Sequence, residues 1–233
     1  MTLQHVDYVF KLIAFLFAIS FHESAHAWMA NRCGDPTARM LGRITLNPIK
    51  HIDPVGTVLL PLIALIYHVP IMGWAKPTPV NPRNFKNPML DDILTSVVGP
   101  VSNFAIVLGT MGVLGLIALV SQLGRAIIHA IPFAYPDRLD LLTAQTSSVL
   151  MPISLLLYDL ALINIVLGIF NLIPVPPLDG SHVLRHFLPD PLQKAYDTVG
   201  WFGLLALVYF GRDFLGRLIF PVIDTFNAVV IKL

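Results

Sequence analysis

Five consecutive residues, His22-Glu-Ser-Ala-His26, carry a compact set of chemically reactive side chains. On an α-helix, positions i and i+4 share one face, so the two imidazoles can bind one zinc ion. Glu23 then lies beside the metal, where it can act as a general base. It is the single glutamate among 14 acidic residues. The alternative interpretation is a polar helix face, or histidines that serve a heme or a channel.

A zinc hydrolase site needs a third protein ligand and one open position. With no glutamate left, we expect the third ligand among the other His and Asp residues, and Asp179 is the best candidate. It follows Asn171-Leu-Ile-Pro-Val-Pro-Pro-Leu, in which three prolines interrupt the helix, and Gly180 then permits a tight turn. Asp-Gly is also a common surface turn. Paired with the histidine motif, the ligand interpretation is favoured.

Two further residues with metal-ligating side chains, His51 and Asp53, follow Lys50 in the sequence. They could be spare ligands. Because they lie outside the predicted helices in a basic loop, capping or loop hydrogen bonding is the favoured interpretation.

The composition predicts that these residues are carried by a membrane protein. Of 233 residues, 55% are hydrophobic and 12% are charged, about half the charged fraction of a typical soluble domain. A formal net charge of +1 gives no basic surface for a nucleic acid, so none is expected as a partner. Cys33 is the single cysteine, which excludes an internal disulfide and a cysteine zinc cluster.

The apolar runs predict an all-α polytopic membrane protein that forms one domain over residues 1–233. Residues 55–72 form a further apolar run with three prolines in or beside it, so we expect it to be re-entrant or interfacial. A small membrane-associated β or re-entrant segment is thus placed between the first and second spans. About four transmembrane helices are expected to surround the zinc site, over residues 8–30, 97–120, 153–173 and 199–220.

The position of the two ligand sets constrains the topology. Both lie near the C-terminal ends of their helices, so those helices must cross the membrane in the same direction. An odd number of crossings must then separate them, which span 97–120 supplies if residues 55–72 do not cross. Residues 31–53 and 73–92 carry four and three basic residues, which favours the cytoplasmic side for both. The N-terminus is then outside and the zinc site roughly 10 Å below the cytoplasmic surface.

These motifs together resemble the site-2 protease family of intramembrane zinc metalloproteases. The resemblance rests on residues 22–26, on residues 171–180, and on Gly99-Pro-Val-Ser-Asn103 in the intervening span. Two stretches, Gly34–Thr57 and Gly73–Phe85, are similar to the compact bacterial and archaeal branch. Family members often carry a PDZ or CBS domain, for which we expect no room in this chain.

The resemblance implies one zinc ion bound by His22, His26 and Asp179, with Glu23 activating water. It implies cleavage of a peptide bond in or beside the transmembrane segment of a single-span membrane protein, in the lipid bilayer of a prokaryotic cytoplasmic membrane. A catalytically silent relative that binds membrane helices is the alternative, and the intact Glu23 argues against it. A metal transporter would need ionisable residues spread along several helices, which the spans lack.

Two asparagines are candidates for substrate binding. The amide of Asn103 could bond the substrate backbone or the developing oxyanion, and Asn171 is a similar candidate. For both, a hydrogen bond between or within helices is the alternative. Strand-like pieces within residues 44–85 could also pair with an extended substrate by strand addition.

Overall fold

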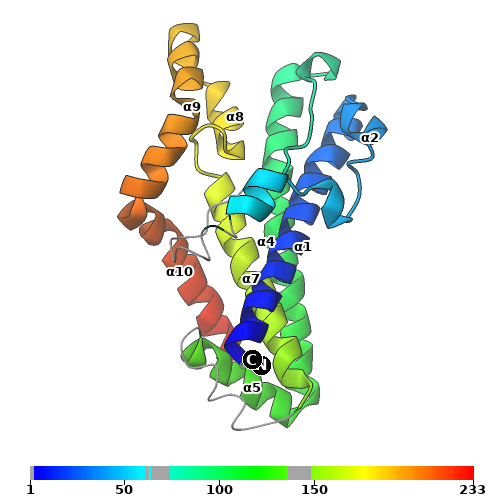
Figure 1. The fold of residues 1–233 in the computed structure, drawn as a ribbon, viewed down its shortest axis with the longest axis vertical. Coiled ribbons are helices and arrows are strands. Elements are labelled where there is room, and N and C mark those ends of the chain that lie inside the picture. Colours follow the sequence, from blue (N-terminus) through cyan, green and yellow to red (C-terminus); the bar gives the residue numbers. More distant parts are fainter. Residues whose placement is uncertain (1–2, 61–62, 64–73, 136–147) are drawn as a thin grey trace. The chain divides into compact units, whose positions relative to one another are not determined.

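The computed structural model describes residues 3–60, 63, 74–135 and 148–233, and regular structure in these ranges is helical (Figure 1). The membrane-associated strand expected between the first two spans is not present among these residues. Most of segment 55–72 lies outside the described residues; its first part belongs to a short π-helix. The elements are α1 (Leu3–Cys33), α2 (Thr37–Met40), η1 (Pro48–Lys50), η2 (Pro54–Leu59), η3 (Pro82–Asn84), α4 (Pro88–Val120), α5 (Gln122–Ala134), α7 (Leu150–Asn171), α8 (Asp179–Arg185), α9 (Asp190–Phe210) and α10 (Arg212–Val230).

Three helices of the described chain are long and apolar enough to cross a membrane: Asp7–Cys33 within α1, all of α4, and all of α7. Helices of 27, 33 and 22 residues extend about 40, 50 and 33 Å, against a hydrocarbon core of about 30 Å. They contain the expected spans 8–30 and 97–120 and most of 153–173. The helix α5, with 13 residues, is too short to cross.

The expected fourth span, residues 199–220, does not form one straight helix. The backbone at Gly200 is non-helical, with φ +35°, and Gly211 separates α9 from α10. Arg212 and Asp213 begin α10 immediately after this break. The two charged residues already interrupt the apolar run in the sequence, and the backbone separates two helices at this point.

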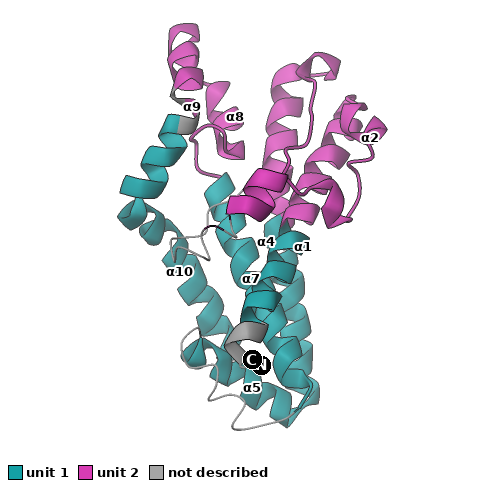
Figure 2. Ribbon diagram, in the orientation of Figure 1, with its two compact units in different colours: residues 1–18, 103–171, 201–233 teal, residues 19–102, 172–200 magenta. Residues whose placement is uncertain are grey.

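The described residues form two compact units, coloured in Figure 2. The first comprises residues 1–18, 103–171 and 201–233. In it, α5, α7 and α10 pack against one another around a buried apolar cluster that also includes side chains of α4. Leu114, Leu155 and Val230 are almost completely buried there.

The second unit comprises residues 19–102 and 172–200, and its loops are held by buried polar side chains. Asp35 accepts hydrogen bonds from the backbone N–H groups of Thr37 and Asn81, from the Thr37 hydroxyl and from the Asn84 side chain. It is fully buried, so these bonds replace the water that the carboxylate loses. They tie the loop after α1 to the chain that leads into α4.

We expect Asp35→Asn to lower the free energy of unfolding by about 2 kcal/mol, because the amide presents N–H groups to donors that need an acceptor. Burial raises the pKa of Asp35, but the bonds from Asn81, Thr37 and Asn84 outweigh it and hold this pKa below its ordinary value. The carboxylate therefore contributes stability above about pH 4, and the contribution is lost as the pH falls through the lowered pKa.

Thermal unfolding in detergent micelles as a function of pH measures this effect. The difference between wild type and Asp35→Asn should be largest near neutral pH and shrink in acid. Asp224→Asn, at an exposed position of α10, is the matched control and should unfold like wild type. Equal midpoints for Asp35→Asn and Asp224→Asn would contradict the role given to Asp35.

Candidate metal centre

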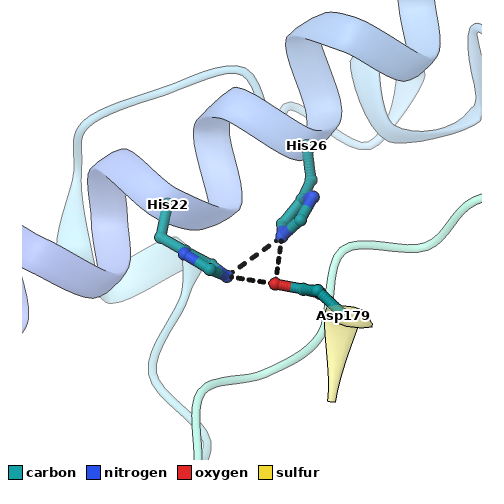
Figure 3. Close-up of side chains that lie close together, drawn as sticks. All are labelled: His22, His26 and Asp179. Atoms are coloured by element: carbon teal, nitrogen blue, oxygen red, sulfur yellow. Dashed lines mark hydrogen bonds and ion pairs between the residues drawn. The ribbon is translucent and has the colours of Figure 1, made fainter. Parts of the chain in front are cut away.

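The histidines of the HESAH motif lie on one face of α1 and point towards Asp179, the first residue of α8 (Figure 3). The Nε2 atoms of His22 and His26 are 3.0 Å apart. The Oδ2 atom of Asp179 is 3.1 Å from the first and 3.4 Å from the second. Both imidazoles are buried. Three potential ligand atoms from two distant parts of the sequence therefore converge within the second unit.

These distances fit a tetrahedral metal site. Ligands about 2.05 Å from a zinc ion at tetrahedral angles lie about 3.3 Å from one another, close to the three observed separations. The Asp179 Oδ2 atom is buried and receives no hydrogen bond from the described residues. A buried carboxylate oxygen that faces two imidazoles suits a divalent cation.

The orientation of His26 is set by the helix that packs beside it. Its Nδ1 atom lies 2.6 Å from the carbonyl oxygen of Thr95, in α4. Because a carbonyl oxygen can only accept, Nδ1 carries the proton and donates it, which leaves the Nε2 lone pair facing Asp179. This tautomer is the one that a metal ligand requires.

Gly99 of α4 provides the close approach that this packing needs. A Cβ atom at this position would lie 2.3 Å from His26 Nε2 and 2.7 Å from His22 Cε1. No side chain larger than hydrogen fits without displacing the imidazoles. Gly99 therefore lies directly against the candidate metal ligands.

Asp179 is placed by the proline-containing turn between α7 and α8. Prolines at positions 174, 176 and 177 prevent α7 from continuing, and Tyr196 donates a hydrogen bond to the Pro174 carbonyl. Gly180 packs so tightly that a Cβ atom there would lie 2.2 Å from the Leu172 carbonyl oxygen. The tight turn expected at Gly180 is wrong: Gly180 is the second residue of α8, and it is the close contact with the Leu172 carbonyl that requires a glycine there.

The predicted general base, Glu23, is held by a residue that the motif does not indicate. Its Oε2 atom accepts a hydrogen bond of 2.8 Å from the Thr78 backbone N–H, and the Thr78 hydroxyl lies 2.7 Å from the same oxygen. Glu23 is half-buried, between the two histidines in sequence. Its carboxylate therefore has a defined position next to the candidate metal ligands.

The two predicted substrate-binding asparagines make helix contacts within the first unit. Asn103 is fully buried and its amide donates to Asn164 Oδ1 at 2.8 Å, linking α4 to α7. Asn171 donates to the Leu167 carbonyl of its own helix. These are the hydrogen bonds that were weighed against substrate binding, and a role at the oxyanion stays a prediction.

The spare ligand candidates have local roles. The His51 ring lies 2.8 Å from the Thr45 carbonyl, and Asp53 caps η2 by accepting from two backbone N–H groups. His182, one turn after Asp179, has its Nδ1 atom 3.8 Å from Asp92 Oδ2, and Asp92 raises the pKa of His182. The favoured interpretation of His51 and Asp53, capping and loop hydrogen bonding, is therefore confirmed.

Thr78, Thr95 and Gly99 were not assigned roles from the sequence alone. Thr95 and Thr78 contact the motif across 69 and 55 residues of chain, and nothing local to either marks the contact. The sequence shows the Gly99-Pro100 pair, but it does not indicate that Gly99 packs against the histidines. For Thr78, the one available signal was its place between two prolines.

Comparison with known proteins agrees with this geometry. The model of peptidase family M50 matches residues 10–210. A Bacillus subtilis protein named "Putative zinc metalloprotease YwhC" is 34% identical over 225 residues, covering 96% of this chain and 90% of that protein. "Putative zinc metalloprotease Rip2" of Mycobacterium tuberculosis is 24% identical over 217 residues, covering 86% and 66%. No solved structure matches the chain. On the family match and on the similarity to YwhC, the chain belongs to peptidase family M50, the site-2 proteases.

Proposed function

We propose that the chain is a zinc-dependent intramembrane endopeptidase that cleaves a peptide bond in or near the transmembrane segment of a single-span membrane protein. The observation that carries this proposal is the convergence of three ligand atoms within 3.4 Å beside the single glutamate. The motif lies in a helix apolar enough to cross a membrane. Membership of a zinc-dependent metalloprotease family supports the same reaction.

In this proposal one zinc ion is held by His22 Nε2, His26 Nε2 and Asp179 Oδ2. When bound, the ion would act as a Lewis acid towards water and the scissile carbonyl. Glu23 takes the proton of the attacking water and passes it to the nitrogen of the leaving amine. The Thr95 carbonyl keeps His26 in the ligating tautomer throughout.

The motif lies in a helix apolar enough to cross a membrane, which suits a substrate that is itself a transmembrane segment. A transmembrane helix hides its carbonyl groups in intrahelical hydrogen bonds, so the substrate must unwind locally before attack. A single-span protein with helix-weakening residues near its cleavage site is the substrate class proposed.

We further propose four crossings in a prokaryotic cytoplasmic membrane, with the N-terminus outside and the metal centre towards the cytoplasm. The described residues between α1 and α7 contain one helix able to cross, α4. This is the odd number that brings the two ligand segments to the same depth. The basic residues of 31–53 and 73–92 favour the cytoplasmic side. The region of α9 and α10 would supply the fourth crossing in spite of its break.

The test is metal analysis combined with cleavage of a reporter. The reporter carries two soluble tags joined by one transmembrane helix with a central Gly-Pro pair. Purified wild type should contain one zinc ion per chain and cleave the reporter, whereas His26→Ala should contain less than about a tenth of the zinc. Removing the metal with a chelator should abolish cleavage, and added zinc should restore it. A wild type that holds zinc but cleaves no reporter of a panel would indicate the silent relative.

A further inference from the structure

The segment before η3, residues 74–80, is firmly attached to the rest of the second unit. The backbone N–H of Lys76 donates to the His51 carbonyl at 2.8 Å. The guanidinium of Arg43 donates to the carbonyls of Lys76 and Pro77, at 2.7 Å each, and to that of Lys50. Arg43 is buried, so these bonds are sheltered from water. The residues immediately before Thr78 are therefore fixed in place.

Thr78 presents one isolated backbone donor. Its neighbours Pro77 and Pro79 have no N–H group, so the Thr78 amide is the single backbone donor between Lys76 and Val80. A residue before proline is restricted to extended conformations, which limits the directions this amide can take. It points at Glu23 Oε2. With these groups engaged, residues 76–78 offer little backbone for the strand addition expected from the sequence.

The amide is a more rigid donor to Glu23 than the hydroxyl. The Thr78 hydroxyl lies 2.7 Å from Glu23 Oε2 and 3.0 Å from the Glu23 backbone carbonyl, and its single proton can go to either. The amide proton has no such freedom. Both donors act on Oε2, and Oε1 receives no hydrogen bond from the described residues. One oxygen of the carboxylate is thus anchored while the other stays available.

We propose that the Thr78 backbone amide is a positioning group for the general base, and that the two prolines and Arg43 hold it in place. The anchor at Oε2 limits the movement of the carboxylate and leaves Oε1 for the water to be activated. Misplacing a catalytic group by about 1 Å can cost about a hundredfold in rate. This role rests on the proposed function, but the contact itself can be tested without activity.

Hydrogen exchange in metal-free protein tests the contact. Within a longer peptide, residues 76–80 contribute three exchangeable amides, those of Lys76, Thr78 and Val80, because prolines have none. In Glu23→Ala the Thr78 amide loses its acceptor, and we expect one of the three amides to exchange at least about tenfold faster than in wild type. Unchanged exchange of all three would overturn the proposal whether or not the protein is a protease.

Kinetics on the single-span reporter test the consequence. Thr78→Val removes the hydroxyl and keeps the amide, whereas Thr78→Pro also removes the amide and keeps an extended backbone. We expect Thr78→Val to retain at least a third of wild-type kcat, and Thr78→Pro to lose about a hundredfold in kcat with KM and zinc content unchanged. Thr225→Val, which removes an exposed hydroxyl on α10, is the matched control.

Two kinetic outcomes would overturn the proposal. Equal kcat for Thr78→Pro and Thr78→Val would show that the amide does not matter. An increased kcat in Thr78→Pro would show that residues 76–80 restrain the base instead of positioning it. If wild type cleaves no reporter, the proposed function fails, and the exchange experiment still decides whether the amide holds Glu23.

Discussion

Exchanging Glu23 for glutamine is expected to reduce reporter cleavage about a thousandfold and to leave the zinc content of the protein unchanged. Glutamine has nearly the same shape as glutamate and its carbonyl oxygen can still accept the Thr78 amide proton. It cannot take a proton from water, so the loss should appear in kcat, with little change in KM. The metal ligands in the proposal, His22, His26 and Asp179, are untouched.

The measurement is kcat on the single-span reporter together with zinc per chain in the same preparations. Asp213→Asn, an acid-to-amide exchange at an exposed position of α10, should match wild type in both. Cleavage by Glu23→Gln within tenfold of wild type would rule out Glu23 as the general base. Loss of zinc from Glu23→Gln would instead indicate that Glu23 holds the metal.

Gly99→Ala is expected to weaken zinc binding about 10- to 100-fold and to lower reporter cleavage at least as much. The added methyl group would lie 2.3 Å from His26 Nε2, far inside van der Waals contact. Either the imidazoles or α4 must move, and either movement changes the ligand separations of 3.0–3.4 Å that fit the metal. Alanine is a better helix former than glycine, so helix propensity alone predicts that Gly99→Ala stabilises α4.

Gly109→Ala is the matched control, because it makes the same exchange in the same helix, where a Cβ atom meets nothing within 4 Å. Zinc affinity can be measured by competition with a chromophoric chelator, and helix content by circular dichroism. Gly109→Ala should keep wild-type zinc affinity. If Gly99→Ala binds zinc as tightly as Gly109→Ala, the close packing of Gly99 on the histidines is not required for zinc binding.

Local patterns in the sequence identified the parts of the site that depend on local geometry. His22, Glu23 and His26 are predicted from helical periodicity, and the long helices from hydropathy. Each of these predictions needs a window of about twenty residues or fewer. Asp179 follows a proline turn that ends an apolar run, but its choice as the third ligand also depended on the histidine motif more than 150 residues earlier.

The remaining features depend on contacts between distant segments or on single backbone angles. Thr95 and Gly99 reach the histidines because α4 packs on α1, which no local pattern encodes. The kink inside α9 is at Gly200 and the break between α9 and α10 is at Gly211, and a hydropathy average over many residues hides two glycines in an apolar run. For Asn103, the residue type alone does not distinguish substrate binding from a hydrogen bond to a neighbouring helix. In the structure its amide binds Asn164.

The distribution of the ligands along the chain also sets the order of events during biosynthesis. His22 and His26 are translated early, but the third ligand follows more than 150 residues later. A nascent chain whose synthesis has reached the end of α7 offers only two of the three proposed ligands, too few for a hydrolytic zinc site. The proposed site can therefore be completed only after Asp179 has been synthesised.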